Sequence, residues 1–529
     1  MRWNIIQSDG TELQEKYHLT SLAAKVLAAS DLSEDKIEEL LNPGPLTTSH
    51  APCVKQACAR IAKAKENKEK VFIGGDYDAD GICATAIMKK TLDVFGLQTG
   101  YYIPDRLKEG YGLSVHTVEM VHERGYSLII TVDNGVKAID ALKRAKELGM
   151  DVIVTDHHVI EEEVEADIVV HPDYMEEPYR TLSGAGVALE ISRNLIGDDP
   201  DLTSLAMTAA IGDVMPLWGE TRRIVIYGLD HLHEGRPKSL CALLNNTNDF
   251  DEVSVAFQIV PKLNAVSRMD DDANPNRIVT YLLSDNPAQI RFMAEQINHE
   301  NESRKYHSRT MIEKASALMD EKSFQVIYDP SFKQGLAGLA AGKIAEACHK
   351  PTLVLAEKDD LLTGSARSVD GFNIYDFFSD FDELEAFGGH AKAAGLSLKK
   401  ENYASFCTHI DRKMQETGFV YEEPVQNAIE IDADEMTIDN VMGLSAIRPV
   451  PKDIQQPEFA IRNPVVLDKK EYIKVLRYHY ANVCGGFDGV IFNQSVAGND
   501  NPSAVIGTPS INRYRSRITV QMIIDAFKD

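Results

Sequence analysis

Three aspartates alternate in the segment 74–81 (GGDYDADG), at Asp76, Asp78 and Asp80. Core packing does not explain them, because an unpaired buried carboxylate costs free energy. A solvent-exposed turn is the simpler alternative. EF-hand calcium loops also alternate aspartates, but the twelve-residue loop and its final glutamate are missing here. The segment therefore predicts a cation site built from these three side chains.

Further candidate ligands follow along the chain. Asp133 stands in VDNG, His157 and His158 stand in TDHH, and Asp213 stands in the apolar context IGDVMP. Carboxylates with a few histidines suit manganese or magnesium, and these residues suffice for two ions. Two ions about 3.5 to 4 Å apart can stabilise the entering and leaving oxygens of a phosphoester. The pattern predicts metal-dependent phosphoester hydrolysis with two divalent cations, manganese being favoured and magnesium the alternative.

These residues follow short β-rich runs. From Val71 onward the runs VFIGG, YSLIITV, DVIVT and DIVV alternate with helical stretches. That alternation is typical of βαβ units on a parallel sheet, where ligands gather at the carboxyl ends of the strands. We therefore expect an α/β fold whose sheet edge carries the first three polar clusters.

The chain divides into five predicted segments. Residues 1–60 form a helical lead-in, with Ser33 as an N-cap, and residues 61–285 form the parallel-sheet domain. Residues 286–322 contain neither Gly nor Pro after Pro287, which predicts a connector helix roughly 50 Å long. A smaller α/β domain follows over 323–424, and a β-rich domain over 425–529.

The composition limits the class of protein. The net charge of −26 speaks against an anionic partner such as DNA, although it does not exclude a local basic groove. No run approaches the roughly 20 apolar residues that span a bilayer, and no apolar stretch of signal-peptide length opens the chain. Seven scattered cysteines, never spaced as CxxC, indicate free thiols. We expect a cytoplasmic monomer that does not contact a membrane.

The blocks GDYDADG, VDNG, DHH and GDVMP, in this order, resemble the DHH phosphoesterase superfamily. The resemblance implies that Asp78, Asp80, Asp133, His157 and Asp213 bind the two metals, with Asp76 as a weaker ligand. It also implies that His158 faces the scissile phosphate and stabilises charge in the transition state. His158, Asp133 and His157 are thus the predicted catalytic residues. The second half resembles the DHH-associated domain, through GSARS from Gly364 and GGH from Gly388.

Other stretches resemble the RecJ family, namely IPDR from Ile103, GAGV from Gly184 and PKLNA from Pro261. This resemblance implies a 5′–3′ exonuclease of single-stranded DNA that releases 5′-mononucleotides in DNA repair and recombination. Arg106, Ser365 and Arg367 would then bind the 5′-terminal phosphate, and Arg268 and His390 the strand nearer the cleavage point. The chain departs from the family pattern around Phe332, where the usual Trp-His pair is missing, and in the block NAVSR, which ends at Arg268.

The C-terminal segment contains the run RYRSRITVQMI from Arg513. If it is one strand, Arg513, Arg515 and Arg517 share a face, with Tyr478, Tyr480 and Tyr514 available to stack on bases. This arrangement resembles the OB-fold barrel of RecJ proteins, and a charged edge strand is the alternative. Because every predicted metal ligand lies at or before Asp213, removing residues from 425 onward is expected to leave the chemistry unchanged.

Two other functions compete with the exonuclease. A DHH phosphodiesterase acting on short oligonucleotides or cyclic dinucleotides would share every metal ligand. A non-catalytic replication scaffold on the same fold would have lost ligands, whereas all are present here. Single-stranded DNA is the expected partner, and a single-strand-binding protein or a helicase is a candidate protein partner.

Overall fold

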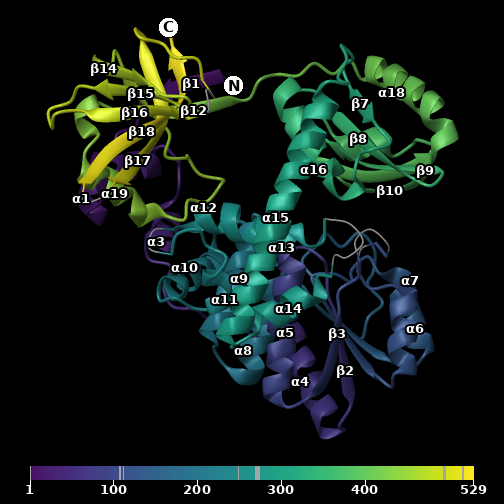
Figure 1. Cartoon of the computed structure of the whole chain (residues 1–529). Coiled ribbons are helices and arrows are strands. Elements are labelled where there is room, and N and C mark those ends of the chain that lie inside the picture. Colours follow the sequence, from purple (N-terminus) through teal and green to yellow (C-terminus); the bar gives the residue numbers. More distant parts are fainter. Residues whose placement is uncertain are drawn as a thin grey trace. The chain divides into compact units, whose positions relative to one another are not determined.

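The chain folds into two units, each of which is described by itself (Figure 1). The computed structural model describes residues 2–105, 109–110, 112–247, 250–268, 274–492, 496–514 and 517–529. One unit, here called the catalytic unit, comprises residues 46–215 and 224–422. The other, here called the C-terminal unit, comprises residues 1–45, 216–223 and 423–529.

The first sheet of the catalytic unit is parallel and has the strand order β3-β2-β4-β5-β6. Its strands are β2 (Lys70–Gly74), β3 (Gln98–Tyr102), β4 (Leu128–Val132), β5 (Asp151–Thr155) and β6 (Ile168–Val170). The strands β4 and β5 are almost wholly buried, as expected when helices cover both faces of a parallel sheet. The predicted parallel α/β architecture is confirmed.

Helices cover this sheet on both sides. Apolar residues of α6 (Val115–Glu123) and α7 (Ile139–Glu147) form one core with β2, β4 and β5. Three helices, α4 (Pro52–Glu66), α5 (Ala79–Phe95) and α8 (Gly184–Ile196), pack together against the sheet. Further helices complete this part of the unit: α9 (Pro200–Gly212), α10 (Gly219–His233), which enters this unit at Ile224, α11 (Lys238–Cys241), α12 (Glu252–Ser254), α13 (Val260–Ala265) and α14 (Asn276–Leu282).

A single long helix, α15 (Pro287–Ser316), leads to the second sheet (Figure 1). Its N-cap is Asn286, whose side chain accepts hydrogen bonds from the Ala288 and Gln289 backbone amides. Proline at the first helical position costs no hydrogen bond, since that amide has no partner within the helix. The structure thus contains the connector helix that the sequence predicts.

The second sheet has the order β10-β11-β9-β8-β7, and all its pairs except β7 with β8 are antiparallel. Its elements are β7 (Gln325–Tyr328), α16 (Gln334–Cys348), β8 (Thr352–Lys358), β9 (Leu361–Arg367), α17 (Ile374–Phe378), β10 (Leu384–His390), β11 (Ala393–Lys399) and α18 (Tyr403–Thr417). Phenylalanines dominate one core of this sheet, including Phe324, Phe377 and Phe378. This smaller α/β domain also follows the prediction.

The C-terminal unit is built on an open sheet of eight strands in the order β1-β12-β13-β17-β18-β16-β15-β14. These are β1 (Arg2–Ile6), β12 (Val425–Glu430), β13 (Phe459–Arg462), β14 (Val466–Glu471), β15 (Val475–Tyr480), β16 (Phe487–Phe492), β17 (Ala504–Tyr514) and β18 (Arg517–Lys528). Among the described residues β1 and β14 remain edges, so the predicted OB-like barrel is not confirmed. A β-rich domain at this end of the chain is present.

The N-terminal segment belongs to this same unit. It contains β1 and three helices, α1 (Thr11–Tyr17), α2 (Ser21–Ala28) and α3 (Glu34–Leu41), and Ser33 caps α3 as predicted. β1 pairs in parallel with β12, more than 400 residues away along the chain. Side chains of α2 share a core with α19 (Ile438–Gly443) and with the sheet. The lead-in is therefore helical, but residues 1–45 fold with the C-terminal unit.

Two details of the predicted nucleic-acid face are wrong. Tyr478 and Tyr480 are fully buried and stack on each other with ring centroids 5.8 Å apart, so they cannot stack on bases. The arginine run is not one strand, because β17 ends at Tyr514 and β18 begins at Arg517. Arg513 pairs with Ile518 and Arg517 with Tyr514, which puts the two arginines on opposite faces of the hairpin. Arg515 and the side chain of Tyr514 lie outside the described residues.

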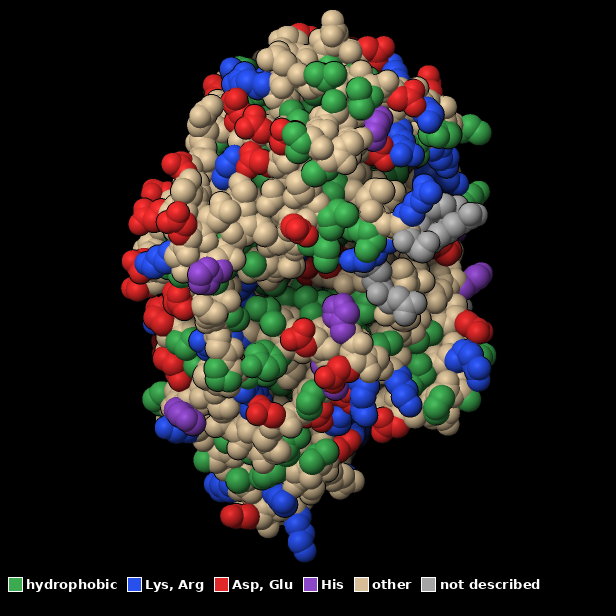
Figure 2. Space-filling view, turned by 90° about the vertical axis from the view of Figure 1, so that its left-hand side faces the viewer, with side chains coloured by type: hydrophobic (Ala, Val, Ile, Leu, Met, Phe, Trp, Pro, Cys, Tyr) green, Lys and Arg blue, Asp and Glu red, His purple; other side chains and the backbone are tan. Residues whose placement is uncertain are grey.

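The surface is consistent with an acidic protein. On the face drawn in Figure 2, Asp and Glu side chains are interspersed with Lys and Arg. No helix in the described part of the chain combines the length and the apolar character needed to cross a bilayer.

Candidate metal centre

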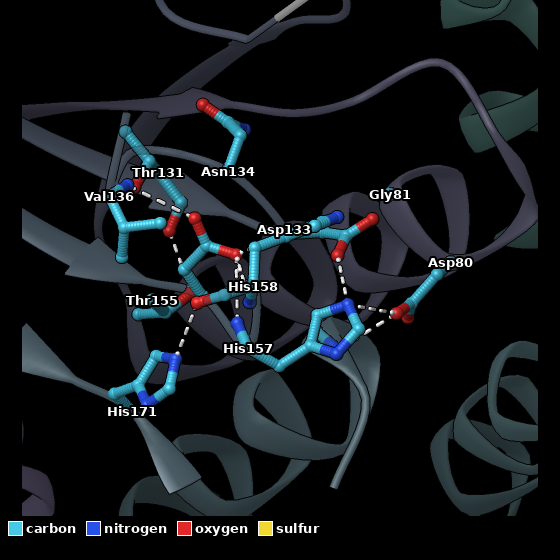
Figure 3. A network of polar contacts seen from close by, with 12 residues as sticks. Asp80, Gly81, Thr131, Asp133, Asn134, Val136, Thr155, His157, His158 and His171 are labelled. Atoms are coloured by element: carbon cyan, nitrogen blue, oxygen red, sulfur yellow. Dashed lines mark hydrogen bonds and ion pairs between the residues drawn. The ribbon is translucent and has the colours of Figure 1, made fainter. Parts of the chain in front are cut away.

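The predicted ligands meet at the carboxyl ends of three neighbouring strands. The aspartate loop from Asp76 follows β2, Asp133 follows β4, and the segment 156–158 follows β5. β4 lies between β2 and β5 in the sheet, so the three loops are adjacent. Figure 3 shows the side chains of Asp80, Asp133 and His157 converging there.

The start of helix α5 fixes two of the ligands, Asp78 and Asp80. Asp78 is the N-cap, and its Oδ1 accepts hydrogen bonds from the backbone amides of Asp80 (3.0 Å) and Gly81 (3.1 Å). Asp80 is buried at the start of the helix. Its carboxylate accepts hydrogen bonds from the Ser183 hydroxyl (3.1 Å) and from the amides of Gly184 (2.8 Å) and Ala185 (2.7 Å). Two helix N-termini, those of α5 and α8, thus stabilise carboxylates at this edge.

Asp133 adopts a left-handed backbone conformation, with φ of 61°. Short polar side chains tolerate this region better than most residues, but it remains uncommon. Its amide donates to the carbonyl of Thr155 at 3.0 Å, which ties the end of β4 to that of β5. A Cβ on Gly184 would lie 2.5 Å from the Asp133 side chain. Only glycine at position 184 allows helix α8 to begin this close to Asp133.

His157 lies among three carboxylates that come from three different elements. Its Nε2 is 3.1 Å from Asp133 Oδ1, 3.5 Å from Asp213 Oδ2 and 3.6 Å from Asp80 Oδ2. Asp213 comes from the C-cap of α9, far along the chain from the β2 loop. The fourth predicted block is therefore part of the same cluster.

The possible ligand atoms form three overlapping groups, and within each group these atoms lie within 4.8 Å of one another. The groups are Asp133 with His157 and His158; Asp80 with His157 and Asp213; and Asp76 with Asp78 and Asp133. All six predicted metal ligands and His158 are thus brought together.

The electrostatics favour cations at this cluster. Burial raises the pKa of Asp133 well above its ordinary value, and the negative charges of Asp80, Asp78 and Asp76 raise it further. Burial likewise raises the pKa of Asp80, only partly offset by His157. Buried carboxylates this close together repel one another unless positive charge is supplied. A set of aspartates and histidines suits Mn²⁺ or Mg²⁺, and the overlapping groups have room for more than one ion.

Asp156, the first residue of the DHH triplet, is fully buried and accepts four hydrogen bonds. They come from the amides of Val136 (3.0 Å), His157 (2.8 Å) and His158 (3.1 Å) and from His158 Nδ1 (2.8 Å). Burial would raise the pKa of Asp156, but the hydrogen bonds and charge of His158 together with the hydrogen bond from the Val136 amide outweigh it, and the pKa is lowered. Burial would lower the pKa of His158, but the hydrogen bond and charge of Asp156, with the charges of Asp213 and Asp80, outweigh it and the pKa is raised. Asp156 therefore shapes the loop and orients His158.

Two other residues of the network were not singled out from the sequence. His171 Nε2 contacts the carbonyl of His158 at 2.9 Å, as drawn in Figure 3, and it is 2% exposed. Asn134 donates to the carbonyls of Gly74 and Val132 and accepts from the amide of Leu113. The position of Asn134 inside VDNG was the only signal for it. His171 stands in no motif, so nothing in the sequence distinguished it from an ordinary core histidine.

The predicted phosphate contacts of the second sheet share one of its faces. Arg367 on β9 pairs with Ala393 on β11, which pairs with His390 on β10. Ser365 is two residues before Arg367 and therefore projects on the same side. A Cβ on Gly338 of α16 would lie 2.6 Å from Arg367 Nη2 and 3.4 Å from Ser365 Oγ. Gly338 thus leaves room for both side chains.

Of the two remaining residues that we predict to contact DNA, the structure describes Arg268 but not Arg106. Arg268 is half-buried, and its carbonyl approaches within 2.2 Å of the point where a Cβ on Gly335 would stand. The start of α16, where the chain departs from the family pattern, therefore packs closely on Arg268. Arg106 lies outside the described residues.

Comparison with known proteins agrees with this geometry. The model of the DHH family, N-terminal domain, matches residues 70–212, and that of the DHHA1 domain matches residues 321–416. The single-stranded-DNA-specific exonuclease RecJ of Bacillus subtilis (strain 168) is 31% identical over 99% of this chain and 70% of its own length. The chain belongs to the RecJ family.

Solved structures of RecJ support the assignment. RecJ from Thermus thermophilus, in complex with Mn²⁺, shares the fold with a TM-score of 0.85 at 23% identity, over 100% of this chain and 79% of that one. A crystal structure of exonuclease RecJ bound to manganese has a TM-score of 0.64 at 29% identity, over 71% of this chain and 97% of that one. The manganese in that RecJ structure agrees with the predicted divalent cations.

Proposed function

We propose that this RecJ-family chain is a metal-dependent exonuclease that degrades single-stranded DNA from its 5′ end and releases 5′-mononucleotides. The observation that carries the proposal is the convergence of Asp80, Asp133 and Asp213 on Nε2 of His157. A chain that had become a non-catalytic scaffold would not need to gather these carboxylates around one histidine.

The side chains of the cluster have different roles. Asp76, Asp78, Asp80, Asp133, His157 and Asp213 would hold two divalent cations, which activate water and neutralise charge on a phosphate when bound. The amides at the starts of α5 and α8 hold Asp78 and Asp80 in fixed positions. Such pre-organisation matters because a carboxylate that is already oriented loses little freedom when it binds an ion.

His158 is the residue we assign to the phosphate. Its Nδ1 donates to Asp156, so Nε2 is the ring nitrogen that we assign to the substrate. An imidazole paired with a buried carboxylate is favoured in its protonated form. In that form Nε2 carries a proton that it can donate to a non-bridging phosphate oxygen, stabilising negative charge in the transition state.

The second sheet supplies the binding of the 5′ end. Ser365, Arg367 and His390 lie on one face of it, within two strands of one another. A guanidinium and a hydroxyl on one side of a sheet can hold a terminal phosphate through charge-assisted hydrogen bonds. The family resemblance adds Arg106 to the 5′-phosphate site, and it assigns Arg268 and His390 to the strand nearer the cleavage point.

The test is the digestion of a long single strand labelled at either end, with and without Mn²⁺. We expect label to be released first from the 5′ end, only with the cation, and we expect Asp133→Ala to abolish it. Equal release from both ends by the wild type would refute the polarity. Near-normal activity of Asp133→Ala in Mn²⁺ would refute the metal centre.

A second variant tests the 5′-phosphate site. Arg367→Ala should reduce the preference for a 5′-phosphorylated strand by about tenfold or more, the equivalent of one hydrogen bond to a charged group. It should slow the reaction on saturating substrate less. Lys392→Ala is the matched control, because Lys392 lies on the same domain but pairs with Asp370. An unchanged preference in Arg367→Ala would exclude this residue from the site.

We also propose that the C-terminal unit contributes contacts to the strand. Arg513 and Arg517 are both exposed at the end of the β17–β18 hairpin, although on opposite faces. Each arginine that contacts a phosphate contributes about 0.7 to the slope of log affinity against log salt. Replacing both with alanine in a full-length, inactive Asp133→Ala background should flatten that slope by between about 0.7 and 1.4. An unchanged slope would exclude the hairpin from the DNA path.

A further inference from the structure

A buried histidine, His171, contacts the backbone of the loop that carries the DHH triplet. It directly follows β6, the edge strand that pairs with β5, and the triplet directly follows β5. The residue is 2% exposed. Among the described residues it belongs to none of the three groups of possible metal ligands. The burial of this imidazole therefore needs an explanation other than metal binding.

The hydrogen bonds of the ring show where its proton lies. The amide of Asp173 is 3.2 Å from Nδ1, and an amide can only donate, so Nδ1 accepts. The carboxylate of Asp173 is 3.5 Å from the same nitrogen, but it is 66% exposed and water screens its charge. A ring that accepts at Nδ1 carries its proton on Nε2. Nε2 therefore donates to the carbonyl of His158, at 2.9 Å (Figure 3).

This bond extends the pairing of β5 with β6 into the loop. The register of the two strands ends at Thr155 and Val170. One residue further, the amide of Asp156 donates to the carbonyl of Val170 at 3.2 Å. Beyond that point the side chain of His171 takes the place of a backbone donor and binds the carbonyl of His158. The loop is thus attached to the end of β6 at both ends of the triplet.

The bond also completes the fixing of His158. Asp156 accepts the amide of His158 at 3.1 Å and its ring Nδ1 at 2.8 Å, and His171 donates to its carbonyl. The planar peptide groups on both sides of the His158 Cα are therefore held, and together they set the direction of its side chain. His157 is held separately, by its amide on Asp156 (2.8 Å) and its ring beside Asp133 (3.1 Å).

We propose that His171 is a positioning residue that acts through His158. It holds the peptide group that follows His158, so that the imidazole is already oriented toward the phosphate when the substrate binds. Without this bond the peptide group can rotate and the imidazole samples other directions, which weakens its hydrogen bond to the transition state. The inference rests on the role that the proposed function gives to His158. His171 itself touches neither the cations nor the substrate.

The test compares two amide substitutions that differ by one methylene. In His171→Asn the side chain ends near the position of Nδ1, so it can still accept the Asp173 amide but does not reach the carbonyl of His158. In His171→Gln the NH₂ group lies near the position of Nε2 and can restore the bond. In single-turnover cleavage at saturating Mn²⁺, Asn should lower kcat about fivefold or more, and Gln should keep it within about twofold of wild type. Mn²⁺ affinity, measured by calorimetry, should stay within about threefold in both variants, because His157 is held separately.

The matched control is His231→Asn. His231 is a half-buried histidine of the same unit whose ring nitrogens contact Asp201 (2.9 Å) and Glu234 (3.2 Å). Asp201 lies in the first turn of α9, at the opposite end of that helix from the ligand Asp213. This variant should leave kcat within about twofold of wild type, since it loosens a histidine away from the metal centre.

A double-mutant cycle with His158→Ala separates positioning from general stability. If His171 acts through His158, His171→Asn should change kcat less than about twofold once His158 is alanine. If His171→Asn does not fold, His171→Ser, whose hydroxyl can also accept the Asp173 amide, takes its place in the cycle.

Three results would overturn the proposal: wild-type kcat in His171→Asn, equal losses in the Asn and Gln variants, or the same loss with and without His158. The cycle also tests the proposed function separately. Wild-type kcat in His158→Ala would refute the assignment of His158 to the phosphate, and this inference with it. A slow His158→Ala beside a normal His171→Asn would refute only the positioning role.

Discussion

Replacement of Asp156 by asparagine should separate the orientation of His158 from the binding of metal. The asparagine side chain has nearly the same shape, but only one of its two polar atoms can accept hydrogen bonds. The wild-type Oδ1 accepts three hydrogen bonds from His157 and His158, and Oδ2 accepts one from the Val136 amide. The amide nitrogen of the substituted side chain would therefore face at least one buried N–H.

The size of the effect follows from these contacts. A buried donor left without its acceptor costs about 1 to 3 kcal/mol of folding stability. Loss of the negative charge removes roughly half the strength of the hydrogen bond to His158, about 1 to 1.5 kcal/mol. If His158 stabilises the transition state, that loss lowers kcat about 5- to 13-fold.

The assay is single-turnover cleavage of a single strand at saturating Mn²⁺, together with Mn²⁺ titration. Asp156→Asn should lower the rate and leave the Mn²⁺ affinity within about threefold, since Asp156 is not in any of the three ligand groups among the described residues. Asp173→Asn is the control, because Asp173 is exposed and contacts the neighbouring His171 ring. An unchanged rate would refute the assigned role of His158. A loss of Mn²⁺ affinity as large as the loss of rate would mean that Asp156 acts through the metals.

Two further substitutions test local geometry and charge. Gly184→Ala should lower Mn²⁺ affinity at least tenfold, because the new Cβ would lie 2.5 Å from the Asp133 side chain. Gly74→Ala is the control, since the atom nearest to its new Cβ would be 3.6 Å away. Equal Mn²⁺ affinities of the two variants, measured by calorimetry, would contradict this prediction. Burial, and then the charge of Asp525, raises the pKa of Glu458 to about 7. Between the ordinary value of 4.5 and about 7 the folded state binds more protons than the unfolded state, so the pair's contribution to stability falls as pH rises. Glu458→Gln should therefore stabilise the protein at pH 8 relative to pH 5. The effect should be under about 1 kcal/mol, because water screens this partly exposed pair. If the free energies of unfolding of variant and wild type in urea differed by the same amount at both pH values, the prediction would be contradicted.

The positions of the metal ligands were predictable because they follow a rule of backbone geometry. Asp78, Asp133 and His157 each follow a short β-rich run, and the carboxyl ends of neighbouring parallel strands meet at one sheet edge. The connector helix was predictable for a similar reason, since a long stretch without Gly or Pro and with helical spacing has few other structures available. Asp213 was placed by its apolar context and by the family resemblance.

Other features depended on contacts between distant parts of the chain. The sequence shows that Asp156 is in the triplet, but only the folded loop shows that its two oxygens accept hydrogen bonds from Val136, His157 and His158. Tyr478 and Tyr480 alternate in a charged run, yet the other strands of the sheet bury them. A periodic pattern tells which residues share a face, but not whether another element covers that face.

The sequence by itself determined the chemistry of this protein, because residue types and their spacing after strands decide which cation a site can bind. Tertiary structure alone decided what holds that chemistry in place. Nothing local connects β1 with β12, or residues 216–223 with the carbonyls of Leu40 and Pro449. These pairings are chosen by the burial of apolar surface and of backbone polar groups across hundreds of residues, which no window of sequence contains.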